Sequence, residues 1–275
     1  MTDTSLPAKP AVVPIASGVP THRLADRPLV TPVTLPSRGI PYNVGGKNWL
    51  PEGKCLVSSM TVKDVKMYAN KALDPHDKAS LLLFNTCLFG ELKPDDLILA
   101  DQFFLLIKVR AISYGNKYPF QMMCSACDTQ FKHEIDIERT MGYKELSDEW
   151  EEPFKVQLPV SQHIVELRLL RGADERAISS KVKKSKQQGG GEAGAKLGLA
   201  LAQAIMTVNG ETLTGLAAQA FVEKLAMRDC QAIEDTIDEN SCGYDPEFEV
   251  PCSECGFNQM VRLPFGPDFF RATDS

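Results

Sequence analysis

The stretches "MMCSACDTQF" (residues 122–131) and "VPCSECGFNQ" (residues 250–259) are the most informative parts of this 275-residue chain, because each contains a CxxC pair. Around each pair, apolar and polar residues alternate, which is typical of strand, tight turn, strand. Such a turn is the pattern of a zinc knuckle, and two knuckles supply the four thiolates that a tetrahedral zinc ion requires. The sequence therefore predicts one four-cysteine zinc site built from distant parts of the chain. The predicted ligands are Cys124, Cys127, Cys252 and Cys255.

Three other roles for these cysteines fit the sequence less well. A thioredoxin-like redox centre has one CxxC at a helix N-terminus, not two that are flanked by strands. The closely spaced CxxCxxC runs of ferredoxins are absent, although iron remains an alternative to zinc in a four-thiolate site. A disulfide within a CxxC is strained, and disulfides are rare in the reducing cytoplasm where we expect this chain to be made.

We expect the zinc to be structural, because four cysteines close a coordination shell that a catalytic zinc leaves open to water or substrate. "VPCSEC" matches the PCxxC half of a zinc-deaminase signature, but the HxE half is missing. The sequence also has no HExxH motif, no nucleophile elbow and no triad-like order, so we expect no enzymatic activity. The predicted zinc would instead hold the C-terminal strands beside the middle of the chain.

Composition and charge exclude several classes of protein. Hydrophobic residues make up 43% of the chain and charged residues 24%, as in an ordinary soluble globular protein. A formal net charge of −6 argues against a protein that coats nucleic acid by bulk charge. No apolar run approaches the roughly 20 residues of a membrane-spanning helix, and the N-terminus lacks the pattern of a signal peptide. We therefore expect no membrane partner, and we do not favour nucleic acid as a partner.

Residues 1–34 should form an extended or disordered arm, because they contain six prolines and few large apolar side chains. A disordered tail and an arm that lies along a neighbouring subunit have the same composition, so both interpretations remain open.

Residues 35–116 should be mainly helical. Helices are predicted from Thr61, from Asp74–Pro75 to Gly90, and over residues 100–115, the last buried on most sides.

The remainder of the chain completes an α+β fold, in which helices surround a small antiparallel β region. Residues 117–171 should form the β region with the first knuckle. Residues 172–240 should be helical, with a helix at 196–208 followed by a turn at Asn209–Gly210. Residues 241–275 should contain the second knuckle and strands that pack on 117–171.

The segment "KVKKSKQQGGGEAGAK" (residues 181–196) admits two interpretations, a phosphate or nucleic-acid contact and a solvated loop. We favour a flexible loop at residues 183–196. The glycines lack the spacing of a phosphate-binding loop, and no aromatic residue is interleaved for base stacking.

The order of several motifs resembles the T4-type bacteriophage baseplate protein family. These motifs are "LPSRGIPY" (35–42), "LADQFFLLIKVRAISYG" (99–115) leading into a strand and the first CxxC, and "AMRDCQAIEDTI" (226–237) before the second CxxC. The resemblance covers roughly residues 35–265, and its most specific parts are residues 35–42 and 99–127. It implies a component of the central hub region of a contractile tail, assembled in the host cytoplasm from this chain and other baseplate and tail proteins, self-contacts included.

Two alternatives to a built-in baseplate subunit remain open, an assembly factor absent from the finished virion and a zinc-ribbon protein that binds nucleic acid. A zinc-ribbon protein that binds nucleic acid would need a basic face, whereas the knuckle around Cys252 and Cys255 carries Glu247, Glu249 and Glu254.

The motif at residues 35–42 is expected to contribute subunit contacts. The residues expected to do so are Pro36, Arg38, Gly39 and Tyr42.

Overall fold

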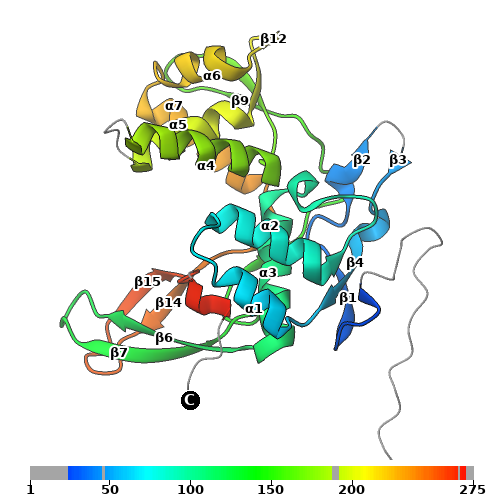
Figure 1. Cartoon of the computed structure of the whole chain (residues 1–275). Coiled ribbons are helices and arrows are strands. Elements are labelled where there is room, and N and C mark those ends of the chain that lie inside the picture. The colour runs from blue at the N-terminus through cyan, green and yellow to red at the C-terminus, as the bar shows by residue number, and fades with distance from the viewer. Residues whose placement is uncertain (1–23, 45–46, 188–191, 266, 271–275) are drawn as a thin grey trace, which may run out of the picture.

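The computed structural model describes residues 24–44, 47–187, 192–265 and 267–270. Within these ranges the chain is an α+β fold of seven α-helices and several small antiparallel sheets (Figure 1). None of the described helices has the length and apolar character needed to span a membrane. The helices are α1 (Val62–Tyr68), α2 (Pro75–Thr86), α3 (Leu99–Tyr114), α4 (Gly172–Gln187), α5 (Glu192–Ala204), α6 (Gly215–Val222) and α7 (Met227–Glu239).

The strands are short and pair locally or across the chain. They are β1 (Val30–Thr34), β2 (Asn43–Val44), β3 (Lys47–Asn48), β4 (Lys54–Ser58), β5 (Cys87–Leu88), β6 (Lys117–Met123), β7 (Gln130–Asp136), β8 (Tyr143–Lys144), β9 (Phe154–Gln157), β10 (Ile164–Leu167), β11 (Ile205–Val208), β12 (Glu211–Thr212), β13 (Gly243–Tyr244), β14 (Glu247–Pro251) and β15 (Asn258–Arg262). Short 3₁₀ turns include η4 (Pro94–Asp96) and η5 (Pro267–Phe270).

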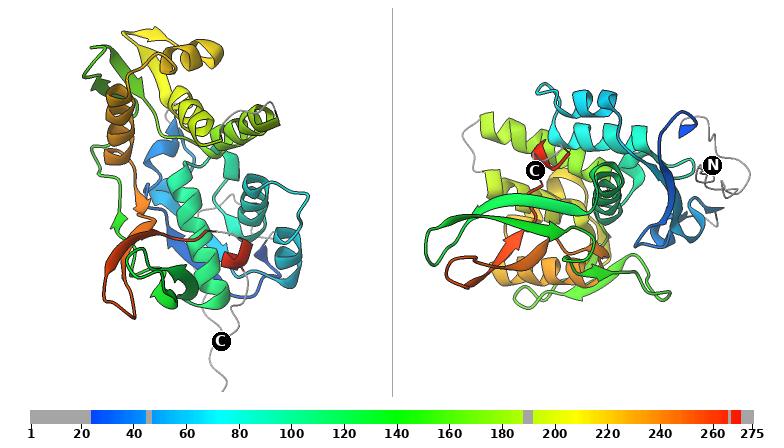
Figure 2. Two further views of the ribbon diagram at one scale, coloured as in Figure 1. Left: turned by 90° about the vertical axis from the view of Figure 1, so that its left-hand side faces the viewer. Right: turned by 90° about the horizontal axis from the view of Figure 1, so that it is seen from below.

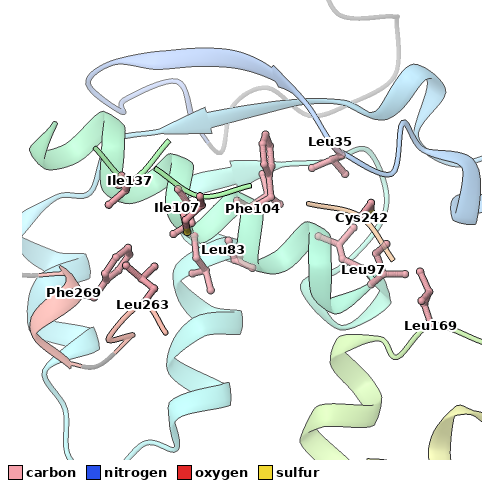
Figure 3. Close-up of a cluster of buried hydrophobic side chains, with 14 of the residues drawn as sticks. Leu35, Leu83, Leu97, Phe104, Ile107, Ile137, Leu169, Cys242, Leu263 and Phe269 are labelled. Atoms are coloured by element: carbon pink, nitrogen blue, oxygen red, sulfur yellow. The ribbon is translucent and has the colours of Figure 1, made fainter. Parts of the chain in front are cut away.

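Helix α3 forms the centre of the molecule, as its apolar sequence predicts. Side chains from both ends of the chain pack around it, among them Leu35, Leu263 and Phe269 (Figure 3). Phe104 and Ile107 of α3 are almost fully buried in this core. The helix ends at Gly115, whose φ of 84° favours glycine.

The predicted starts of the first two helices are confirmed. Thr61 and Asp64 form the capping box of α1, and Asp74 precedes α2 with Pro75 in the first turn. Helix α2 ends at Thr86 instead of continuing to Gly90, because the next two residues form β5.

A three-stranded antiparallel sheet, β1-β4-β5, was not expected from the sequence. Strand β4 lies within the segment expected to be mainly helical, and β1 lies within the segment expected to be an arm. The two strands pair from Val30 with Ser58 to Thr34 with Lys54. Residues 30–34 are thus extended, but their hydrogen bonds go to this chain's own sheet. The preceding residues 1–23 lie outside the described part of the structure.

The second half of the fold is a four-stranded sheet, β12-β11-β10-β9, with α5, α6 and α7 beside it (Figure 1). The alternation of buried Val165 and Leu167 in β10 agrees with the predicted strand. The helix expected at residues 196–208 ends at Ala204, since Ile205–Val208 pairs with β10 as β11. Asn209 and Gly210 have φ values of 51° and 83°, which confirms the predicted turn.

Much of the loop expected at residues 183–196 is helical. Residues up to Gln187 belong to α4, and α5 begins at Glu192. The intervening residues 188–191, which include the three glycines, lie outside the described residues.

Two antiparallel hairpins, β6–β7 and β14–β15, lie side by side although they are far apart in the sequence (Figures 1 and 2). The rings of Phe120 in β6 and Phe248 in β14 pack edge to face, with centroids 6.3 Å apart. The hydroxyl of Tyr118 donates a hydrogen bond to the carbonyl of Pro264, beyond β15. These contacts bring the two CxxC turns to the same end of the paired hairpins.

Candidate metal centre

The first CxxC turn joins β6 to β7 and directs a backbone N–H toward the sulfur of Cys124. The N–H of Ala126 donates to Sγ of Cys124 at 3.4 Å. The turn is closed by hydrogen bonds from Cys124 N to Thr129 O (3.0 Å) and from Asp128 N to Cys124 O (3.0 Å). Asp128 has a φ of 55°, a conformation that aspartate tolerates better than most residues.

The second CxxC turn repeats this geometry between β14 and β15. The N–H of Glu254 donates to Sγ of Cys252 at 3.4 Å. Cys252 N donates to Phe257 O (2.9 Å), and Gly256 N donates to Cys252 O (3.0 Å). Gly256 has a φ of 72° at the position that corresponds to Asp128. The two turns therefore share one backbone design.

The four sulfurs of the two turns form one cluster, with all ligand atoms within 4.8 Å of one another. Sγ of Cys124 lies 3.7 Å from Sγ of Cys255, and Sγ of Cys127 lies 3.8 Å from Sγ of Cys252. A tetrahedron with metal–sulfur bonds of about 2.3 Å has sulfur–sulfur edges of about 3.8 Å. A disulfide would require about 2.05 Å. The spacing therefore fits four thiolates around a single metal ion.

One polar side chain links the two turns next to the sulfurs. Oε1 of Gln259, in β15, accepts hydrogen bonds from the backbone N (2.9 Å) and the hydroxyl (3.1 Å) of Ser125. Its Nε2 donates to the carbonyl of Met123 at 3.1 Å. Gln259 thus holds the first turn in register with the second hairpin. The sequence gives no indication of this role, because a lone glutamine in a strand has no distinguishing signal.

The thiols titrate as an interacting group. Side-chain and backbone hydrogen bonds from Thr129 lower the pKa of the Cys127 thiol to about 6. The backbone N–H of Phe257 lowers the pKa of Cys255, but desolvation and the neighbouring thiols, Cys127 first, outweigh it and raise this pKa to about 12. The first thiolate forms easily, but each further thiolate is repelled by those already charged. A bound cation would offset this repulsion.

The burial of the cluster is graded. Cys124 and Cys252 are buried, whereas Cys127 and Cys255 are exposed at the tip of the hairpins. Across the described residues, no other group of three or more His, Cys, Asp or Glu side chains is close enough to hold a metal ion. Four protein thiolates would leave no coordination position for a substrate, so the arrangement suits a structural ion.

The motif "LPSRGIPY" is placed inside the chain's own fold. The hydroxyl of Tyr42 donates to Asp101 Oδ2 at 2.6 Å and accepts from the N–H of Ile98 at 3.0 Å. A Cβ on Gly39 would lie 2.1 Å from the carbonyl oxygen of Leu50, so this position requires glycine. Pro36, Gly39 and Tyr42 are buried, and Arg38 is partly exposed and forms an ion pair with Asp148 at 2.6 Å.

The burial of these residues has a cause that the sequence did not reveal. The partner of Tyr42, Asp101, is a fully buried carboxylate on α3 that also accepts a hydrogen bond from the N–H of Ser37. The motif is therefore ordered by the core of its own chain. A role in subunit contact stays a prediction, and Arg38 is the member of the four with exposed atoms.

The family described as T4 bacteriophage base plate protein matches residues 47–271 of the chain. Neither the curated proteins nor the solved structures contain a match.

Proposed function

Because the chain belongs to the T4 bacteriophage base plate protein family, we propose that it is a structural, non-enzymatic subunit of the hub region of a contractile-tail baseplate. In this proposal it assembles with other baseplate and tail proteins in the host cytoplasm and is retained in the virion. A single zinc ion, held by the four-cysteine cluster, stabilises its fold.

The observation that carries the zinc proposal is the arrangement of the four sulfurs. Sulfur–sulfur distances of 3.7 and 3.8 Å equal the edge of a zinc tetrathiolate to within about 0.1 Å. The paired knuckles also supply N–H donors that would stabilise thiolate charge. Zinc is proposed over iron because Zn²⁺ has no redox chemistry and suits a closed tetrahedral site whose only task is to join two hairpins.

The proposal assigns the zinc to folding and not to chemistry. With four thiolates bound, the ion has no vacant position to activate water. Each hairpin is a two-stranded ribbon, which is marginally stable alone, so the ion would fix both ribbons at the end farthest from the core.

Quantitative mass spectrometry of purified, DNA-filled particles tests the baseplate proposal. Peptides of this chain at a fixed ratio to a known tail protein are the expected result, and the ratio would give the copy number. Abundant chain in infected cells with none in particles would instead identify an assembly factor.

Elemental analysis of the purified protein is expected to give one zinc per chain, and iron at that stoichiometry would refute the choice of metal.

A further inference from the structure

A groove with a volume of about 650 Å³ lies between α2, α3, α4 and the segment that follows β15. Its lining is largely apolar and includes Phe103, Leu106, Val182 and Phe265. The rings of Phe103 and Phe265 have their centroids 5.7 Å apart. Phe265 remains 37% exposed, so this aromatic wall is open to an incoming chain.

The charged residues at the rim of the groove are already paired with one another. Lys183 forms an ion pair with Asp74, and Lys196 forms one with Glu175 at 3.4 Å. Arg262 lies 3.6 Å from Glu247. An occupant that brought its own charge would have to compete with these pairs, so the groove suits an uncharged apolar segment.

The chain itself contains such a segment outside the described residues. "PAVVPIASGVP" (residues 10–20) has three prolines, four β-branched aliphatic side chains and no charge. Proline-rich segments favour the polyproline II conformation, which loses little entropy on binding and docks into aromatic-lined grooves. We propose that residues 10–20 of one copy occupy this groove in a neighbouring copy of the chain.

The geometry favours the neighbour's groove over the chain's own. Only three residues separate Pro20 from Leu24, where the described chain begins, and this connection spans at most about 14 Å. Leu24 leads into β1, which lies on one side of α2 and α3, whereas α4 and β15 lie on the other side (Figures 1 and 2). Since each helix is about 10 Å across, the C-terminal part of the segment does not reach its own groove.

Two copies that exchange segments reciprocally form a closed two-fold dimer. Copies that each pass the segment to the next build a ring where the rotation closes. The inference concerns a surface away from the cysteine cluster. It depends neither on the metal nor on retention in the virion, so its failure would leave the proposed function standing.

Sedimentation velocity of the full-length chain over a range of concentrations tests this inference. Wild-type protein is expected to self-associate. Phe265→Asp, which alters the groove, and the double variant Val12→Asp/Val13→Asp, which alters the segment, should each weaken association at least tenfold. Leu216→Asp is the matched control, since Leu216 is 82% exposed on α6, outside the groove, and its variant should associate like wild type.

Mixing the two altered proteins separates a contact between copies from one within a copy. The intact segment of the Phe265→Asp protein should enter the intact groove of the Val12→Asp/Val13→Asp protein, giving a 1:1 pair. Ser179→Arg, at the groove face of α4, is a second groove variant in case Phe265→Asp disturbs folding. A wild-type chain that stays monomeric, variants that associate like wild type, or a mixture that stays monomeric would each overturn the inference.

Discussion

At the scale of single residues, the cysteine cluster illustrates how one side chain depends on three others. Each sulfur lies within 4.8 Å of the rest, and the pKa values of Cys127 and Cys255 move in opposite directions to about 6 and about 12. Without a cation, the thiolates repel one another. When a cation is bound, its attraction to the four closely spaced thiolates offsets their repulsion. The free energy of metal binding then contributes to the stability of the fold.

Replacing Cys255 with alanine should abolish stoichiometric metal binding. Because structural zinc sites contribute on the order of 10 kcal/mol of apparent binding free energy, the free energy of unfolding should fall by several kcal/mol. Elemental analysis and thermal unfolding measure the two effects. Cys230→Ala, at a buried cysteine of α7 outside the cluster, should keep the metal. A metal-free Cys255→Ala protein with wild-type thermal stability would contradict the structural role.

Replacing Gln259 with alanine should weaken metal binding without abolishing it. The loss of its bonds to Ser125 and Met123 frees the first knuckle from the second hairpin, and residues that support metal ligands typically contribute 10- to 100-fold in affinity. Competition with a chromogenic chelator measures the change. Asn258→Ala, one residue earlier, serves as the control, and equal affinities for the two variants would refute this role.

The buried carboxylate of Asp101 should make stability depend on pH. Burial raises its pKa to about 6, although hydrogen bonds from Ser37 and Tyr42 oppose this shift. Since the folded pKa exceeds the unfolded value of about 3.9, the contribution is fully present below pH 4 and is lost as the pH rises through about 6. Between pH 5 and 8, the loss is on the order of 1 kcal/mol.

Asp101→Asn should remove this dependence, because the amide does not titrate. Denaturant unfolding of both proteins at pH 5 and pH 8 provides the test. Between these two pH values, the unfolding free energy of the wild type should fall by on the order of 1 kcal/mol more than that of the Asp101→Asn variant. An equal pH dependence of the unfolding free energy in the two proteins would show that the pKa of Asp101 is not raised in the fold.

At the scale of elements, the two hairpins are held together at one end by aromatic packing and at the other by the cysteine cluster. Phe120 and Phe248 meet near the core, whereas the four sulfurs lie at the tip. A two-stranded ribbon is marginally stable in water, so each hairpin needs both attachments.

Metal removal should therefore loosen the hairpins and leave the central helix largely intact. After chelation, hydrogen–deuterium exchange is expected to rise in β6, β7, β14 and β15 and to change little in α3. Lowering the pH from 7 to 5 should act in the same direction, because protons compete with metal for thiolates. Unchanged hydrogen–deuterium exchange in these four strands after chelation would show that the hairpins do not need the metal.

The helices of the first half follow from local sequence signals, whereas two of the strands do not. Helices α1, α2 and α3 were predicted because their signals are local, such as Thr61 with Asp64 and Asp74 with Pro75. Strands β4 and β11 were missed, since their pairing partners are β1 and β10, at a distance in the sequence. Residues 205–208 continue an apolar helical pattern, and the pairing with β10 overrides it.

At the scale of the whole molecule, a short segment after β10 joins the two halves of the fold. The N–H of Leu99 donates to Leu170 O (2.9 Å), and the N–H of Gly172 donates to Leu97 O (3.0 Å). Glu152 supports this segment by accepting hydrogen bonds from Leu169 N at 2.7 Å and Arg171 at 3.0 Å.

Replacing Glu152 with alanine should lower the free energy of unfolding by roughly 1–3 kcal/mol. The expected cause is the loss of the charged partner of the partly buried Arg171 guanidinium and of the acceptor for the N–H of Leu169. Chemical denaturation measures the change. Glu151→Ala removes an exposed carboxylate next to it and should stay within about 0.5 kcal/mol of wild type. Equal effects at the two positions would contradict the role of Glu152.

Local residue patterns and motif order predicted the helices of the first half, the two CxxC turns and membership in the baseplate family, which the match over residues 47–271 confirms. These features depend on local residue patterns or on motif order. The convergence of the four sulfurs, which the repeated CxxC pattern predicted, is confirmed by their spacing. Tertiary contacts that no local pattern predicted link Gln259 to the first turn and bury Tyr42 against Asp101. Each of these contacts joins residues that are distant in the chain, and packing around α3, not local propensity, brings them together.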